Sequence, residues 1–401
     1  MNWKLTLAVL VCNILFMSAS YTMLIPFLPL YLTNELDVAQ NSVNLWSGLV
    51  FSASFVVSAI MAPIWGRLAD RHGKRLMAIR SSLLLSLSYL LCGIVQTPGQ
   101  LVAARLVQGF SAGLWPMDLA IMSVYAPPAR LGLCLGIMQG VLTAGGVIGP
   151  LLGGTLAEFF GMRLSFFVGA AALFLNCLMF IFIIKEPPAT KPKTSENTDK
   201  KHHSLLSLPL IRHLLIAGLL VQMVILILQP IITTYIVSLA GNLPNLVFVS
   251  GLVFSLGGIA GAIAAPAWGA FGQRRGFIRS MMFALGCAGA GIIFQGIPDD
   301  LCTFAVMQFI CGLFFAGIHP AINALLAHHS PADAKGQIFG LLFAAQQIGS
   351  IAGPVLGGLI ATFFGMKYVF FLAGTILLAL AVFIHQRFTR VRGLRKLFKT
   401  A

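Results

Sequence analysis

Residues 47–52 read SGLVFS, and the same six letters return at residues 250–255. Further along, GPLLGG at residues 149–154 returns as GPVLGG at residues 353–358. Since both pairs keep nearly the same separation, the chain consists of two homologous halves that run in the same direction. Parallel repeats of this kind predict a pseudo-two-fold axis along the membrane normal, with a ligand site between the halves.

The composition excludes a water-soluble protein. The chain has 401 residues, of which 58% are hydrophobic and only 9% charged, and its mean hydropathy is +0.92. A soluble domain carries about a quarter of its residues charged. Apolar stretches of about 20 residues recur along the chain, and each is long enough to cross a bilayer as a helix. Strands are excluded because backbone groups in lipid must be bonded within their own segment.

These stretches predict an all-α membrane protein with twelve transmembrane helices in two pseudo-symmetric six-helix bundles. The expected helices lie near residues 5–31, 45–65, 76–95, 101–125, 131–159, 164–184, 211–238, 246–268, 279–297, 301–326, 337–362 and 367–386. The segment between the sixth and seventh helices is rich in Lys, Pro, Thr and Ser, so it predicts a flexible cytoplasmic linker. The predicted domains are therefore an N-terminal bundle (1–184), the linker (185–207), a C-terminal bundle (208–386) and a basic cytoplasmic tail (387–401).

The formal net charge of +15 reflects membrane topology rather than nucleic-acid binding. If the N-terminus is cytoplasmic, nearly all loop lysines and arginines fall on the cytoplasmic side. Glu35, Asp37, Asp299 and Asp300 then gather on the opposite side. This positive-inside asymmetry predicts a multi-pass protein of a bacterial inner (plasma) membrane with both termini in the cytoplasm. The seven cysteines form no CxxC pair, so neither a metal site nor a disulfide framework is expected.

The loop after the second predicted helix reads GRLADRHGKR at residues 66–75 and is called the signature loop below. Its glycines permit a tight turn, and its cations face an anionic leaflet. Asp70 is its single acid, and a helix N-terminus would stabilise such a carboxylate by up to about 2 kcal/mol. The alternative is an ordinary basic cytoplasmic loop. The residues expected to form a conformational latch are Gly66, Asp70, Arg71, Gly73, Lys74 and Arg75.

The signature loop resembles the hallmark of the major facilitator superfamily, G-x-L-A-D-R-x-G-[RK]-[RK], between helices 2 and 3. Leu101, Arg105, Gln108 and Gly109 match that superfamily's fourth-helix pattern, L-x-x-x-R-x-x-Q-G. The resemblance covers nearly the whole chain and implies alternating access by two bundles. The sequence also departs from the family pattern. The second-half loop at residues 269–276 lacks the aspartate, and the cytoplasmic end of helix 4, SVYA at residues 123–126, lacks the acid that related antiporters place there.

Helix 5 carries a third match. Gly145, Gly149, Pro150, Gly153 and Gly154 fit G-x-x-x-G-P-x-x-G-G, which characterises the drug:proton antiporter branch. The resemblance implies that helix 5 packs against the opposite half and helps to seal the outer side. Small residues four apart let helix backbones approach, and a proline bends its helix; generic packing is the alternative. The stretches PFLPLY and LWSG, in the first two predicted helices, resemble the MdtG-type multidrug resistance family.

Ionisable residues within the spans are costly and are therefore candidates for function. Arg105 matches the family arginine that is held to influence proton release. The alternative interpretation is that its side chain only extends to the nearby membrane interface. Asp118 is the natural proton carrier or cation-sensing acid. The alternative interpretation is that Asp118 makes a contact between helices on the cytoplasmic side. The two lie about 20 Å apart along one helix, so no direct pair is expected. His319 can titrate near physiological pH but equally suits a core position. Gln108 and Asn323 are expected to contribute polar groups to the ligand cavity between the halves.

The sequence thus predicts a secondary active transporter that exports small amphipathic compounds in exchange for protons. The proton gradient would supply the energy, so no cofactor or enzymatic activity is expected, and the protein is expected to be a monomer in the lipid bilayer. One competing hypothesis is an importer or exporter of a single metabolite, such as a siderophore or a sugar. A membrane-embedded enzyme would need a metal cluster or a nucleophile–base set, and none is visible. A channel is disfavoured by the two-fold repeat.

Overall fold

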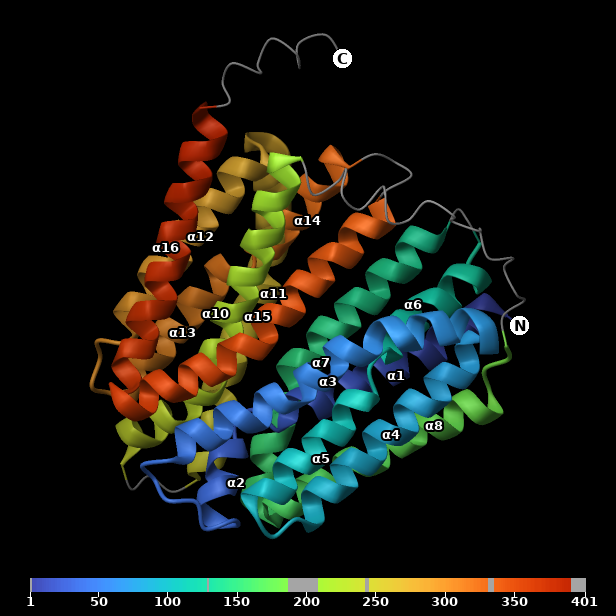
Figure 1. The fold of residues 1–401 in the computed structure, drawn as a ribbon, viewed down its shortest axis with the longest axis horizontal. Coiled ribbons are helices and arrows are strands. Elements are labelled where there is room, and N and C mark those ends of the chain that lie inside the picture. Colours follow the sequence, from blue (N-terminus) through green and yellow to red (C-terminus); the bar gives the residue numbers. More distant parts are fainter. Residues whose placement is uncertain (1, 128–129, 187–207, 242–244, 331–334, 391–401) are drawn as a thin grey trace. The chain divides into compact units, whose positions relative to one another are not determined.

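A computed structural model describes residues 2–127, 130–186, 208–241, 245–330 and 335–390. Within these ranges every regular element is a helix (Figure 1). The helices are α1 (Trp3–Met23), α2 (Leu28–Asn34), α3 (Val43–His72), α4 (Lys74–Ile94), α5 (Pro98–Phe110), α6 (Leu114–Tyr125), α7 (Leu131–Phe160), α8 (Met162–Phe182), α10 (Pro209–Ala240), α11 (Leu246–Arg275), α12 (Phe277–Gln295), α13 (Leu301–Phe315), α14 (Ile318–His329), α15 (Lys335–Phe363) and α16 (Met366–Arg390).

Eleven helical spans in the described ranges are long and apolar enough to cross a membrane. The fourth predicted span is not among them, because the structure divides it into α5 and α6. Gly113 forms the break with a φ of +113°, a conformation that glycine adopts without strain. Pro116, three residues later, lacks the N–H that would continue the helix across the break. The prediction of one unbroken helix at residues 101–125 was therefore wrong.

Two more predicted helices are also divided. Residues 5–31 form α1 and α2, separated at residues 24–27, where Pro26 cannot donate a backbone hydrogen bond. Residues 301–326 form α13 and α14, and Pro320 in α14 cannot bond the carbonyl of the intervening residue Ala316. By contrast, α3, α7, α11 and α15 continue through the prolines that the repeats share: Pro63, Pro150, Pro266 and Pro354.

The contacts divide the chain into two compact units. The first comprises Met1–Thr194, Gln229–Ser255 and Pro354–Thr362, and the second comprises Ser195–Leu228, Leu256–Gly353 and Phe363–Ala401. The first unit thus includes one end of α10, α11 and α15, which belong to the second repeat in sequence. The division into a 1–184 and a 208–386 bundle stays a prediction. Most of the predicted linker and residues 391–401 of the tail lie outside the described residues, and α16 continues to Arg390.

The first unit has an aromatic core where α1, α2, α4 and α8 meet. The Phe166 ring lies 5.6 Å from that of Phe27 and 5.0 Å from that of Tyr31. The buried hydroxyls are also bonded: Tyr31 donates to the Cys92 carbonyl at 2.9 Å, and Tyr89 donates to the Ser20 carbonyl at 2.7 Å. Because these buried hydroxyl groups have hydrogen-bond partners on neighbouring helices, the two tyrosines hold the helices of this bundle together.

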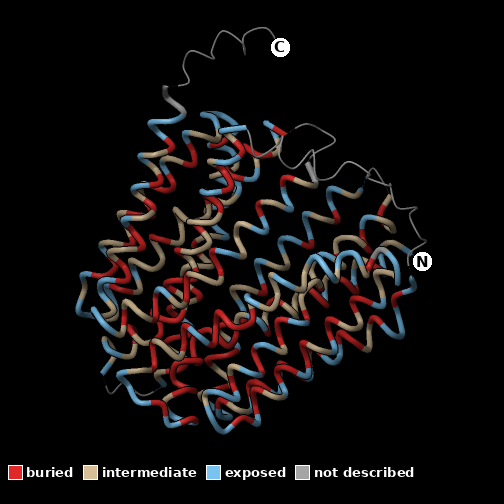
Figure 2. Tube along the Cα trace, in the orientation of Figure 1, coloured by how far each residue is buried: buried red, intermediate tan, exposed pale blue. Residues whose placement is uncertain are grey.

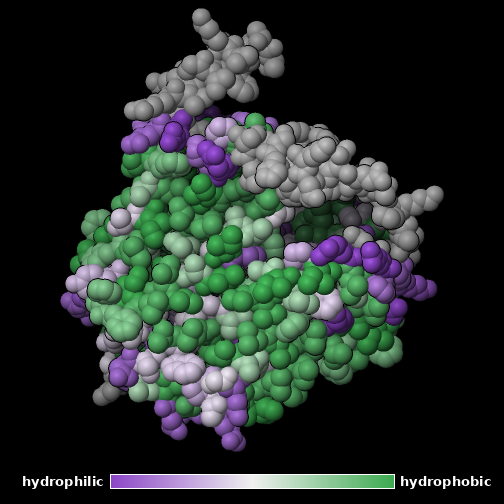
Figure 3. Space-filling view, in the orientation of Figure 1, coloured by the Kyte–Doolittle hydropathy of each residue, from purple (hydrophilic) through white to green (hydrophobic). Residues whose placement is uncertain are grey.

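Large hydrophobic side chains also lie on the surface of the helices. Figure 2 shows exposed residues along the spans, and Figure 3 shows that hydrophobic residues cover much of the visible face. Phe159, Phe182 and Phe364 each expose more than two thirds of their area, at 72%, 79% and 71%. Water would not tolerate such a surface, but hydrocarbon does, so the protein is a multi-pass membrane protein.

Candidate functional site

The helix-5 motif lies in α7, and three of its glycines face α1 in the same repeat. A Cβ atom at Gly145 would lie 2.7 Å from the Ser18 Cβ, and one at Gly149 or Gly153 would overlap atoms of Thr22 or Met23. Side chains of α1 also reach across: Ser18 donates to the Leu142 carbonyl at 2.7 Å, and Thr22 donates to the Gly145 carbonyl at 3.3 Å. The motif therefore lets two backbones touch, as small residues do in membranes.

The corresponding glycines of α15 do the same in the second unit. A Cβ atom at Gly353 would lie 2.6 Å from the Met223 carbonyl oxygen of α10, and one at Gly349 would overlap the Leu219 carbonyl. The duplicated motif is thus first a packing device between the first and fifth helices of each repeat.

Gly154, the last glycine of the motif, faces the other repeat within the first unit. A Cβ atom there would lie 2.9 Å from the Val247 carbonyl oxygen of α11, and one at Gly251 would overlap the Pro150 carbonyl. Two polar contacts accompany this approach, which is called the α7–α11 crossing below. Glu158 Oε2 accepts the Val247 N–H at 3.2 Å, and the hydroxyl of Ser255 donates to the Val147 carbonyl at 2.9 Å.

A second crossing in the first unit repeats this geometry between α3 and α15. A Cβ atom at Gly48 would overlap the Pro354 carbonyl, and one at Gly358 would lie 2.5 Å from the Asn44 carbonyl oxygen. Gly48 and Pro354 are the repeat counterparts of Gly251 and Pro150. At both crossings the two sequence repeats meet backbone to backbone, near the helix ends that the predicted topology assigns to the outer side.

Most of the signature loop is helical, contrary to the prediction of a loop after residue 65: residues 66–72 are the last turns of α3, α4 begins at Lys74, and Gly73 alone makes the turn. The side chain of Asp70 lies outside the described residues, so its expected partner stays a prediction. A Cβ atom placed on Gly66 would have no neighbour within 4 Å among the described residues, and Arg71 is exposed. Gly73 adopts a φ of +96° between the two helices. The backbone N–H groups of Lys74 and Arg75 donate to the Glu186 carboxylate at 2.7 and 3.1 Å.

The predicted intramembrane residues of the first unit form two separate groups. Arg105 is 3% exposed, and its guanidinium donates to Gln108 Oε1 at 2.5 Å and lies 5.7 Å from the Phe51 ring centroid. Asp118 on α6 is fully buried, and neither carboxylate oxygen has a hydrogen-bond partner among the described residues. Among the described residues no ion pair joins Arg105 to Asp118. A fully buried carboxylate without a partner is costly, which marks Asp118 as a functional candidate.

His319 and Asn323 belong to the second unit. They lie four residues apart on α14 and therefore share one face of that helix. His319 is half-buried and Asn323 is exposed.

Arg80 is an intramembrane cation that was not predicted from the sequence. Its guanidinium lies 3.5 Å from the Trp65 ring centroid and donates to the carbonyls of Phe110 at 3.3 Å and Ala112 at 2.9 Å. These carbonyls are free because the helix is broken between α5 and α6 and because Pro116 has no N–H. The available signals were the glycine and proline at positions 113 and 116, which can break a helix and free its carbonyls, and an arginine in the preceding helix; the prediction did not combine them. In the second repeat Phe283 occupies the corresponding place beside Trp268, with ring centroids 6.1 Å apart.

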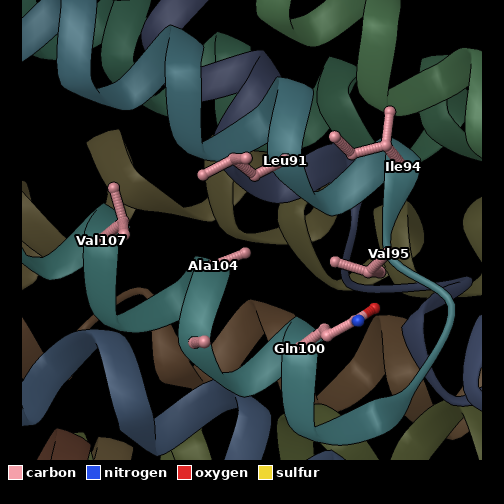
Figure 4. A pocket seen from close by; sticks show the side chains of 7 residues that line it. Leu91, Ile94, Val95, Gln100, Ala104 and Val107 are labelled. Carbon is pink, nitrogen blue, oxygen red and sulfur yellow. The ribbon is translucent and has the colours of Figure 1, made fainter.

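Two apolar cavities are lined by none of these residues. One, of about 360 Å³, lies between α4 and α5, where Gln100 is the polar group among Leu91, Ile94, Val95 and alanines (Figure 4). The other, of about 440 Å³, lies between α12 and α13 at the corresponding place in the second repeat. Among the described residues no three His, Cys, Asp or Glu side chains gather as a metal site would require.

Comparison with known proteins agrees with these features. The family model described as Major Facilitator Superfamily matches residues 10–298 and 247–397. Multidrug resistance protein MdtG of Proteus mirabilis is 33% identical over 378 residues, which cover 94% of each chain. MdtG of Yersinia enterocolitica is 34% identical over 385 residues, covering 95% of this chain and 92% of the relative. The predicted resemblance is therefore confirmed.

Solved structures share the fold at low sequence identity. The nucleoside transporter NupG superposes with a TM-score of 0.79 at 15% identity, covering 97% of this chain and 99% of NupG. A bacterial homolog to the human lysosomal transporter Spinster, in an inward-facing and occupied conformation, gives 0.82 at 16% identity, covering 95% of each chain. The predicted fold class is confirmed. From its motifs, its fold and its relatives, the chain belongs to the major facilitator superfamily.

Proposed function

We propose that this chain exports small amphipathic compounds across a bacterial inner membrane in exchange for protons, by alternating access. The observation that carries the proposal is the near full-length relation, at 33% identity, to proteins named multidrug resistance protein MdtG. The complete drug:proton antiporter motif in α7 supports the same activity and supplies its direction. We infer a transporter without enzymatic activity or cofactor, a monomer with both termini in the cytoplasm.

The two crossings supply a gate for this mechanism. Each is held by a close backbone approach at glycine, which the bonds of Glu158 and Ser255 accompany at the α7–α11 crossing. Because helices in lipid gain little from the hydrophobic effect, such contacts can part and reform at modest cost. In our proposal α7 separates from α11, and α3 from α15, when a compound leaves on the outer side.

Asp118 is the proposed proton carrier. Its carboxyl group is fully buried without a partner among the described residues, so the neutral, protonated form suits its surroundings far better than the anion. Proton loss would therefore require water or an arriving cation to reach α6, and this requirement couples the two ligands. The Arg105–Gln108 pair would adjust proton release. His319 and Asn323 would contribute polar groups for the ligand from the second bundle.

The test is dye transport in everted membrane vesicles, with and without an uncoupler of the proton gradient. The proposal expects uptake of several chemically unrelated cationic dyes, and loss of that uptake with the uncoupler. Uptake that survives the uncoupler would contradict proton coupling. Transport of one sugar, nucleoside or siderophore with no dye transport would identify a carrier for a single metabolite instead.

A further inference from the structure

Glu186, the second residue of the predicted linker, lies at the N-terminus of α4. Its two carboxylate oxygens accept the first two N–H groups of that helix, those of Lys74 and Arg75. A carboxylate is stabilised at this end of a helix, where N–H groups have no partner within the helix. Gly73 makes room for it, since a Cβ atom there would lie 2.6 Å from Glu186 Oε1.

Arg75 makes the reciprocal contact at the C-terminus of α8, just before Glu186. Its guanidinium donates to the carbonyls of Phe180 at 3.0 Å and Ile181 at 2.5 Å. The Phe180 carbonyl is available because the Ile184 N–H donates to Met179 instead. A cation is favoured at a helix C-terminus as an anion is at an N-terminus. The signature loop and the start of the linker thus cap each other's helices.

Tyr125 fixes the linker from a third helix. This residue ends α6, and its hydroxyl donates to the Lys185 carbonyl at 3.0 Å. It lies in the stretch SVYA, where related antiporters carry an acid and this chain carries none. The hydroxyl holds the backbone directly before Glu186, and so places the carboxylate of Glu186 at the loop.

The second repeat shows that the turn itself does not require an acid. Gly276 has a φ of +90°, close to that of Gly73, and α12 begins directly after it. Among the described residues nothing lies within 4 Å of a Cβ placed on Gly276, whereas the Glu186 carboxylate occupies that place beside Gly73. The second repeat therefore makes the same turn without a described carboxylate at this place, which points to a role for the acid of the first repeat beyond forming the turn.

We propose that Glu186 is the acidic counterpart of the signature loop in this chain, and that Tyr125 positions it. The acid comes from the linker rather than from helix 4, so the start of the linker holds the α3–α4 turn in shape while the bundles move. This inference rests on the proposed function, because it assigns Glu186 and Tyr125 as positioning residues for transport.

The test compares Glu186→Gln and Tyr125→Phe with the parent protein, purified and reconstituted in proteoliposomes that carry a proton gradient. Glu186→Gln keeps the size of the side chain and one acceptor oxygen but removes the charge. We expect the maximal dye-transport rate per folded molecule to fall about tenfold, with KM changed less than about twofold, as loss of one charged cap allows. Asp299→Asn, which removes an exposed acid paired with Lys367, is the control and should transport at the parental rate.

Amide hydrogen exchange of the segment that contains Lys74 and Arg75 provides a readout independent of transport. Both variants should exchange faster there than the parent, while the start of α12 should be unchanged. Parental exchange in Glu186→Gln would refute the contact itself. Faster exchange with a parental transport rate per folded molecule would refute the role in transport and leave only a structural cap. If the parent moves no dye, the proposed function fails, but the exchange result still decides whether Glu186 holds the loop.

Discussion

Replacing Gly251 by alanine tests whether the α7–α11 crossing is a gate. The added methyl group would overlap the Pro150 carbonyl and lie 3.3 Å from the Gly154 Cα. Both obstacles are backbone atoms, so no side-chain rotation relieves the overlap. Overpacking of this kind costs about 1–3 kcal/mol. Since the methyl group penalises only the state in which the helices touch, the ratio of touching to separated helices should fall about 5- to 150-fold.

Gly286→Ala is the matched control. Gly286 lies within α12, and among the described residues nothing is within 4 Å of a Cβ placed on it. Both substitutions replace a helical glycine by alanine and therefore gain the same helix propensity, about 1 kcal/mol. Any difference between the two variants consequently reports the crossing rather than the general effect of alanine.

The assay is a distance measurement between spin labels at Phe159 of α7 and Leu252 of α11, both exposed positions, in a background without the seven native cysteines. The longer-distance population should grow at least about fivefold in Gly251→Ala and stay parental in Gly286→Ala. Identical distance distributions in the two variants would refute the idea that this crossing opens and closes.

Three further substitutions test residues of the first unit. Asp70→Asn should insert normally but export dye poorly, and parental transport rates would remove the latch hypothesis. Asp118→Asn should abolish efflux driven by a pH gradient while dye binding persists, since the amide cannot carry the proton; undiminished efflux would exclude Asp118 as the carrier. Arg80→Lys keeps the charge but cannot reach both free carbonyls at the α5–α6 break, so it should destabilise the protein by about 1–2 kcal/mol. An unchanged melting temperature in detergent would contradict that role.

Much of the architecture was predictable because the membrane allows few kinds of spanning structure, and these leave clear patterns in the sequence. A segment that crosses the hydrocarbon core must be a long apolar helix, which is easily recognised in the sequence. The SGLVFS and GPxLGG repeats identify the two equivalent halves. The small residues of the helix-5 motif were expected to let helix 5 pack against the opposite half. Their spacing could not say which neighbour they approach, and the structure shows three of them against α1 and only Gly154 against α11.

The contacts of Arg80 and Glu186 were harder to predict from the sequence, because they join residues that are far apart in the chain. Arg80 acts on carbonyls about 30 positions away that are free only because of a break at Gly113. Glu186 contacts Lys74 across 112 positions. The sequence showed that the acid at the end of helix 4 was missing, but a linker carboxylate among several polar residues gave no signal that it replaces that acid.

The most direct test of alternating access measures two distances in one preparation. One pair of labels, at Phe159 and Leu252, reports the α7–α11 crossing. A second pair, at His72 and Arg275, reports the helix ends that the predicted topology assigns to the cytoplasmic side. On addition of dye and a proton gradient, alternating access predicts that one distance lengthens as the other shortens. If both distances stay constant, or lengthen together, the two repeats do not open alternately and the proposed mechanism is wrong.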